Sequence, residues 1–255
     1  MGILFNLNQY AIGLNPISKL NNPKNKVAFT ANQNGDSFQI TSPERLFNEA
    51  VIRDMIAQNP ELKKILSENK IPIQLNMNEL QELKNGHCRR TQEIAAKISK
   101  NLPVALRDVV NIKALKEGAL LHDFGKVLIP PEILNKNGKL TEEEQKIMKL
   151  HSEIGYNLLK NTVQDPEVLA LVRYHHANKV NPNNFVPDIN LQILNLADKF
   201  SALTEDRVYK KAFTPQQALT IIYSDVQKGE VHPFLYNALA KTVNETTVQE
   251  NVNIS

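Results

Sequence analysis

The stretch ALLHDFGKVLIP, residues 119–130, closes an apolar run with a histidine and an aspartate side by side. Apolar residues at helical spacing predict one helix over about 103–122, and its stripe consists of Ala105, Val109, Ile112, Leu115, Ala119 and His122. Burying this stripe also buries the imidazole of His122 and brings Asp123 toward the core. Because an unpartnered buried imidazole or carboxylate is costly, the fold must supply partners for both side chains.

The rest of the chain also favours helices. Glycine is scarce at 9 of 255 residues, aromatic residues make up only 6%, and sandwiches of short strands usually need more of both. Helix starts are indicated by cap residues at Ser42, Thr141 and Thr214, each followed by proline or by Glu or Gln at the third helical position. No internal repeat and no alternation of strands and helices is visible, so the predicted fold class is all-α.

The chain divides into three parts by composition. Residues 1–41 are rich in Asn, Pro and Ser and predict a poorly structured lead. Residues 42–80 predict an N-terminal helical element. Residues 1–75 as a whole offer either a dimer surface or a lid over the site, so a homodimer is one expectation. Residues 81–245 predict the main helical domain.

Charge and cysteine content limit the partners and the location. A net charge of +3 with scattered Lys and Arg gives no basic stripe, so duplex nucleic acid is not expected as a partner. The single cysteine, Cys88, excludes an intramolecular disulfide and fits a reducing compartment. No apolar run approaches the roughly 20 residues of a membrane helix. We expect a cytoplasmic protein with no membrane partner.

Histidines carry the chemical information. Any one of them alone is best read as an ordinary core or surface residue, and His232 is read as a capping or surface residue. Together they are harder to dismiss, because His122 is beside Asp123, His175 is beside His176, and Asp198 lies within the apolar segment LNLADKF. Imidazole and carboxylate ligands suit iron, manganese, zinc or a similar divalent ion. An aspartate shared between two such ions, about 3.5–4 Å apart, allows a water to be deprotonated for attack on phosphorus.

These motifs together resemble the HD superfamily of metal-dependent phosphohydrolases, and more narrowly its HD-GYP branch, whose usual substrates are cyclic dinucleotides. The resemblance covers about residues 85–240 and rests on HCRRTQEIAAKI, LLHDFGKVLIPPEILNKNGKLTEEEQKIMKLHSEIGYNLL, VRYHHANK and LNLADKFSALTEDRVYKKAFTPQQAL. It implies an HD-type helical bundle, with residues 81–245 as the catalytic domain. It also implies one metal held by His87, His122, Asp123 and Asp198, and a second held by Asp123, His151, His175 and His176.

Other residues are assigned to substrate by the same resemblance. Lys126 would assist the phosphate or the bridging water, so Asp123 and Lys126 are the expected catalytic residues. Arg207 and Lys210 match positions expected to grip substrate phosphates, as a guanidinium fork and an ammonium point charge can. On residue type alone, Lys126 can equally be an exposed loop lysine, and Arg207 and Lys210 can form surface salt bridges.

The chain departs from the family pattern in two places. Ala177 replaces a glutamate after the double histidine, and the Gly-Tyr-Pro loop is absent; NPNNF could form a turn there, with Phe185 offering a face for base stacking. Some relatives hold a third metal through a glutamate one helical turn before the first histidine. That position is Leu83 here, and Glu82 is one residue out of α-helical register, so two metals are expected rather than three.

The leading interpretation is a binuclear metal phosphodiesterase that cleaves a cyclic dinucleotide such as c-di-GMP or cGAMP with a metal-activated hydroxide. Iron or manganese is the expected metal, with zinc, nickel or cobalt as alternatives. A different nucleotide substrate, di-iron oxygenase chemistry, a non-catalytic nucleotide-binding or signalling module, and a purely structural protein remain open. Dioxygen consumption would indicate the oxygenase, and absence of metal from the purified protein would favour the structural reading.

Overall fold

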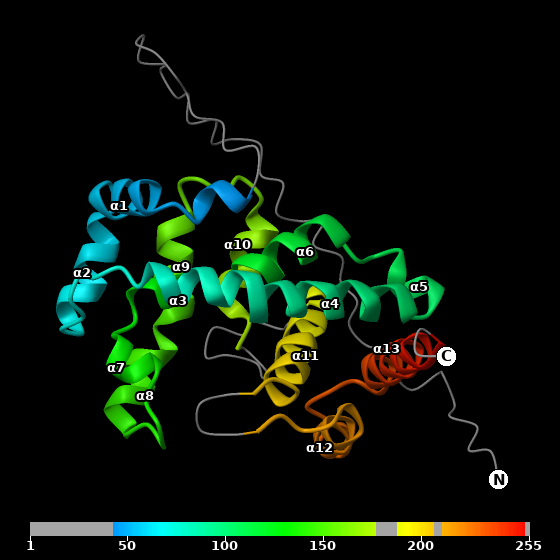
Figure 1. The fold of residues 1–255 in the computed structure, drawn as a ribbon. Coiled ribbons are helices and arrows are strands. Elements are labelled where there is room, and N and C mark those ends of the chain that lie inside the picture. Colours follow the sequence, from blue (N-terminus) through cyan, green and yellow to red (C-terminus); the bar gives the residue numbers. More distant parts are fainter. Residues whose placement is uncertain (1–42, 177–187, 207–210, 253–255) are drawn as a thin grey trace. The chain divides into compact units, whose positions relative to one another are not determined.

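The computed structural model describes residues 43–176, 188–206 and 211–252, and the side chains of these ranges up to residue 245. All regular structure in these ranges is helical, so the predicted all-α class is confirmed (Figure 1). The elements are η2 (Pro43–Leu46), α1 (Glu49–Ala57), α2 (Pro60–Glu68), α3 (Met77–Leu83), η3 (Lys84–Cys88), α4 (Arg89–Asn101), α5 (Val104–Arg107), α6 (Ile112–Leu121), η4 (Phe124–Leu128), α7 (Pro131–Leu134), α8 (Glu142–Lys149), α9 (His151–Leu159), α10 (Pro166–Tyr174), α11 (Ile189–Leu203), α12 (Pro215–Gln227) and α13 (Pro233–Val252).

Helix starts follow the cap signals where those signals lie within the described ranges. Thr141 and Thr214 each accept a hydrogen bond from the backbone of the third helical residue, whose own side chain returns a bond to the cap, and α8 and α12 begin there. Ser42 lies outside the described residues. The first α-helix begins later than expected, at Glu49, because Asn48 caps it by accepting from two backbone N–H groups.

The single helix expected over 103–122 is wrong. A four-residue helix, α5, ends at Arg107, and α6 starts at Ile112 after Asn111 accepts a hydrogen bond from the backbone N–H of Ala114. Val109 is 58% exposed and Ile112 is 43% exposed, so neither belongs to a buried stripe. The side chain of Asn111 starts a new helix here, so the apolar periodicity does not predict one continuous helix.

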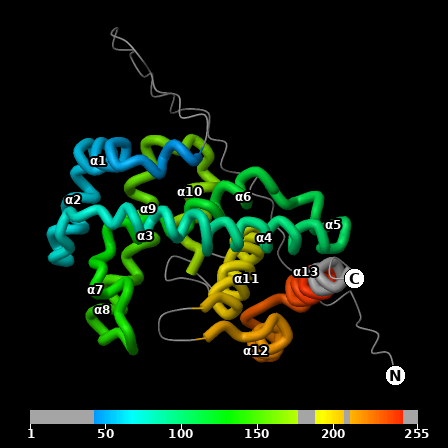
Figure 2. The backbone as a smooth tube through the Cα atoms, in the orientation of Figure 1, coloured from blue at the N-terminus to red at the C-terminus, as the bar shows by residue number. Residues whose placement is uncertain are grey.

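Two apolar clusters form the core, and α6 contributes to both. Ala114, Leu120 and Leu121 pack into a cluster that also takes residues from α1, α2, η4 and α9. Leu115 and Ala119 pack into a second cluster with α4, α11, α12 and α13. Figures 1 and 2 show α4 passing across α6 and α11. The C-terminal end of α6 therefore lies where the two clusters meet, and His122 follows directly.

The chain is helical from Met77 to Asn101, and it continues through Gly86 as a π-helical segment, η3, between α3 and α4. A π-turn spaces its hydrogen bonds by five residues and shifts the side-chain register by one position. His87 lies in this segment, so the residues that neighbour its side chain on the preceding turn differ from those in a regular α-helix. None of the helices in the described ranges has the length and apolar character needed to cross a membrane.

Candidate metal centre

His122 and Asp123 directly follow α6 and are buried, at 0% and 2% exposure. The Nδ1 of His122 lies 2.8 Å from the carbonyl oxygen of Ala119, three residues earlier. A carbonyl oxygen only accepts, so Nδ1 carries the proton and Nε2 points inward as an acceptor. That Nε2 atom has no hydrogen-bond partner, which is rare for a fully buried polar group and indicates a missing ligand.

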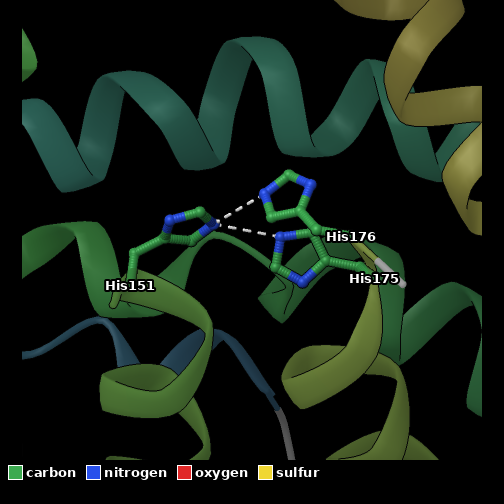
Figure 3. Close-up of side chains that lie close together, drawn as sticks. All are labelled: His151, His175 and His176. Atoms are coloured by element: carbon green, nitrogen blue, oxygen red, sulfur yellow. Dashed lines mark hydrogen bonds between the residues drawn. The ribbon is translucent and has the colours of Figure 1, made fainter. Parts of the chain in front are cut away.

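His151 and His175 repeat this arrangement. The Nδ1 of His151 lies 2.6 Å from the carbonyl oxygen of Met148, and that of His175 lies 2.8 Å from the carbonyl oxygen of Val172. Both rings thus turn Nε2 toward the interior. Figure 3 shows the result: the Nε2 of His151 lies 3.0 Å from the Nε2 of His175 and 3.1 Å from the Nε2 of His176.

Asp123 joins two groups of side chains through its two carboxylate oxygens. Its Oδ2 lies 3.5 Å from the Nε2 of His122 and 3.8 Å from that of His87. Its Oδ1 lies 3.3 Å from the Nε2 of His151 and 4.0 Å from that of His175. One carboxylate therefore faces a different pair of histidines with each oxygen, as a ligand shared between two ions must.

Asp198, on α11, completes the first group. Its Oδ1 lies 3.0 Å from the Nε2 of His87 and 3.8 Å from the Nε2 of His122. The Nδ1 of His87 lies 3.0 Å from Oε2 of Glu205, so this ring contacts a carboxylate at each nitrogen. We call His87, His122 and Asp198 the α11 group, and His151, His175 and His176 the α9–α10 group; Asp123 stands between them.

Charge differs between the two groups. Burial lowers the pKa of His151 to about 4 and lowers the pKa values of His175 and His176 as well. Burial also opposes the charged form of His87, but hydrogen bonds to Asp198 and Glu205 outweigh it and raise its pKa to about 9. At neutral pH the α9–α10 histidines are neutral and ready to bind a cation, whereas His87 holds a proton that a cation must displace.

Lys126 lies against the shared aspartate. Its Nζ donates to Oδ2 of Asp123 at 2.6 Å. Burial would favour a neutral amine, but the neighbouring Asp123 outweighs it and raises the pKa of Lys126. Burial likewise opposes the ionised form of Asp123, and the charge of Lys126 is foremost among those that keep the pKa of this carboxyl well below its usual range. The pair is therefore a charged carboxylate and a charged ammonium.

The donor set fits divalent metal ions. The α9–α10 nitrogens are lone-pair donors with lowered pKa values, and two donors bound at right angles about 2.1 Å from one ion would be roughly 3 Å apart. The separations around His151 and between His87 and Asp198 are close to that value. Nitrogen and carboxylate oxygen donors suit iron, manganese, zinc and related ions. The roles of the seven predicted ligands as metal ligands stay predictions, and the structure brings all seven together.

Two cavities open on this cluster. One of about 340 Å³ is lined by His175, His176 and Asp198, with Gln192 and Asn195 nearer the start of α11. The other, of about 310 Å³, is lined by residues that include His87, Lys126, Glu82, Glu205 and Leu83. Ligand-binding pockets often have volumes in this range.

Three residues near the cluster were not anticipated or were misjudged from sequence. Glu82 was set aside on α-helical register, but a π-helical segment follows it, and both Glu82 and Leu83 line the same cavity as His87. Glu205 was missed, although it follows Asp198 by seven residues, two helical turns. Cys88, which was considered for disulfide formation, is 2% exposed, and its Sγ lies within 4.8 Å of ligating atoms of His122 and Asp123.

The predicted substrate residues Phe185, Arg207 and Lys210 lie outside the described residues, as does Ala177. His232 lies where it was expected, just before α13, and its Nδ1 accepts a hydrogen bond from the backbone N–H of Phe234.

Comparison with known proteins identifies the domain. Residues 86–203 match the family model of the HD domain. The chain carries an HD domain. The His122–Asp123 pair lies inside the matched range, and the resemblance stated from the sequence is confirmed.

Two relatives are similar to this chain in sequence, and one solved structure is similar to it in fold. The cyclic di-GMP phosphodiesterase response regulator RpfG of Xanthomonas campestris is 33% identical over 58% of this chain and 40% of its own length. The 3'3'-cGAMP-specific phosphodiesterase 2 of Vibrio cholerae is 36% identical over 40% of this chain and 21% of its own length. The match thus spans less than half of either relative. The PgpH HD domain of L. monocytogenes superposes with a TM-score of 0.50 and 15% identity, covering 80% of this chain and 100% of that one, and supports the fold.

Proposed function

We propose that this chain is a binuclear metal-dependent phosphodiesterase that hydrolyses a cyclic dinucleotide. The observation that carries the proposal is the position of Asp123, whose two oxygens face two separate groups of histidines. Each group offers three further donors, which supports two ions beside one shared carboxylate. Relatives that match the HD domain are named as cyclic di-GMP and 3'3'-cGAMP phosphodiesterases, which supports the substrate class.

The chain's own residues supply binding and orientation. Two divalent ions, when bound, would supply an activated water and would neutralise charge that develops on a phosphoryl group. The Nδ1–carbonyl bonds of His122, His151 and His175 fix each ring, so that its Nε2 is aimed before any ion arrives. Asp123 stays ionised because Lys126 is charged beside it. Once Asp123 is shared by ions, the Lys126 ammonium is well placed to donate to a phosphate oxygen.

We propose that the substrate occupies the two cavities beside the metal centre. One cavity reaches the α9–α10 group and the other reaches His87 and Lys126, so a ligand with a phosphate at Asp123 has room for a nucleoside in each. We propose that Arg207 and Lys210 grip phosphates and that Phe185 stacks on a base. We propose iron or manganese as the metal, residues 81–245 as the catalytic domain and 42–80 as an accompanying helical element; α1 and α2 pack against α9.

The test is hydrolysis of a cyclic dinucleotide panel, c-di-GMP, 3'3'-cGAMP and c-di-AMP, followed by chromatography. The protein is loaded anaerobically with iron and separately with manganese, and metal is counted in the same samples. Asp123→Ala is compared with wild type and with Asp54→Ala, which removes an exposed carboxylate from α1.

Turnover of one panel member, lost in Asp123→Ala and kept in Asp54→Ala, would support the phosphodiesterase. Two bound ions without turnover of any member would refute the substrate and point to another nucleotide or to a binding module. Full metal content and full activity in Asp123→Ala would refute the site itself.

A further inference from the structure

Glu205 is the one acidic side chain in the described ranges that contacts the outward-facing nitrogen of a candidate ligand histidine. Its Oε2 lies 3.0 Å from the Nδ1 of His87, on the far side of the ring from Asp198. His122, His151 and His175 instead use backbone carbonyl oxygens three residues earlier for the same purpose. His87 thus depends for its orientation on a side chain from a different part of the chain.

The reason is local to the helix that carries His87. This residue lies in the π-helical segment η3, and the backbone does not offer it the carbonyl contact that the other three histidines use. The carboxylate of Glu205, two residues beyond the end of α11, fills that place. Asp198 lies on α11, so this helix and the residues that directly follow it set both contacts of the His87 ring.

Glu205 is itself held in place. The hydroxyl of Ser201, one helical turn earlier, donates to Oε1 at 2.6 Å. Arg90 donates to the hydroxyl of neighbouring Thr204 at 2.9 Å and brings its Nε to 4.0 Å from Oε1. One carboxylate oxygen is thus occupied by Ser201, and the other is directed at His87. Ser201 is fully buried and Glu205 is half-buried, so this is a built contact rather than a chance surface pair.

We infer that Glu205 is a positioning residue that orients His87 as a metal ligand and increases the basicity of its Nε2. A carboxylate behind a ligating imidazole is a recurrent way to fix the tautomer and strengthen the metal bond, and its removal typically lowers metal affinity or activity about 10–100-fold. The inference rests on the proposed binuclear site, and it concerns the α11 group alone. In the α9–α10 group, His151 and His175 are oriented instead by the backbone carbonyl oxygens of Met148 and Val172.

The experiment measures metal binding directly, so it does not depend on finding a substrate. Manganese and cobalt affinities are determined by competition with a chromophoric chelator for wild type, Glu205→Ala, Glu205→Gln and a control, Glu167→Gln. Glu167 is also half-buried and accepts from two asparagines, but it lies on α10 away from the cluster. The cobalt-loaded proteins are then compared by proton NMR in the region of metal-shifted imidazole N–H signals.

Glu205→Ala is expected to weaken the binding of one of the two ions about 10–100-fold and to leave the binding of the other unchanged. Glu205→Gln is expected to have a metal affinity between those of wild type and Glu205→Ala, because its amide oxygen still accepts a hydrogen bond from the Nδ1 of His87. One N–H signal should be lost to solvent exchange in Glu205→Ala and shifted in Glu205→Gln, while the remaining signals keep their positions. Glu167→Gln should match wild type in both measurements.

Unchanged affinities and N–H signals in Glu205→Ala would overturn the inference, as would equal weakening of both ions with a lower melting temperature, which indicates a structural role. A wild-type protein that binds no divalent ion would overturn both this inference and the proposed function. Absence of turnover on every cyclic dinucleotide, with the metal results as expected, would refute the substrate and leave the role of Glu205 standing.

Discussion

Gly125 lies between Asp123 and Lys126 in η4, where the chain passes against the start of α9. A Cβ atom added at this position would lie 2.0 Å from the carbonyl oxygen of His151 and 2.5 Å from the backbone N of Gly155. Both obstacles are backbone atoms, so no side-chain rotation can relieve the contact. Gly125→Ala therefore has to separate η4 from α9.

The required movement follows from the contact distance. A carbon and a carbonyl oxygen approach to about 3.3 Å, so the two segments must move apart by roughly 1.3 Å. Asp123 is on one segment and His151 is on the other, and their facing atoms are 3.3 Å apart. Metal–ligand distances tolerate only about 0.2 Å. We therefore expect Gly125→Ala to lose the ion of the α9–α10 group and to lower turnover about 100-fold.

The same change should destabilise the fold. Overpacking a core costs about 1–3 kcal/mol, and a contact between backbones belongs at the upper end. For a domain of this size about 3 kcal/mol lowers Tm by roughly 6–12 °C. The assay is thermal unfolding of the metal-free protein, followed by a metal count and chelator competition.

Gly229→Ala separates the two effects. Gly229 has a φ of 73°, so alanine there is strained, but nothing lies within 4 Å of the added Cβ. Gly229→Ala should lower the free energy of unfolding by about 1 kcal/mol and still bind both ions. If Gly125→Ala melts with wild type and binds two ions normally, the close approach of η4 to α9 is wrong, and with it the reasoning about His151.

Three further predictions concern single side chains. In the metal-free protein at pH 7, His87 is protonated and His151 is neutral, so metal binding to the α11 group should release close to one proton and metal binding to the α9–α10 group almost none. Calorimetry in two buffers of different ionisation enthalpy measures this proton release. The metal affinity of the α11 group should rise toward pH 9 and level off above it. Lys126→Ala should lower turnover more than metal content, measured on the same samples, and equal losses would contradict a role at the phosphate. Thr141→Ala removes the cap whose partner is Glu144 and should cost about 1 kcal/mol with metal binding unchanged; a calorimetric Tm equal to that of wild type would contradict it.

The sequence by itself determined the fold class and the set of candidate ligands. Helix caps at Thr141 and Thr214 are local signals, because a cap side chain bonds to backbone only a few residues away, and both helices begin where the signal predicted. The polar residues of HD, HH and LNLADKF stood out because such groups are costly in apolar surroundings. The resemblance to the HD superfamily, rather than spacing alone, named the full set of seven side chains, including His87 and His151.

Tertiary structure decided how those side chains meet. Which oxygen of Asp123 faces which histidines depends on how the end of α6, η3 and α9 pack, and nothing local encodes it. Asn111 caps the start of α6 in the middle of what was predicted as one helix. The π-helical segment that contains His87 changed the spacing to the preceding turn, which had been taken to be α-helical. Glu205 reaches His87 across 118 residues of chain. These contacts join distant segments, and their geometry follows from the packing of whole helices rather than from any short stretch of sequence.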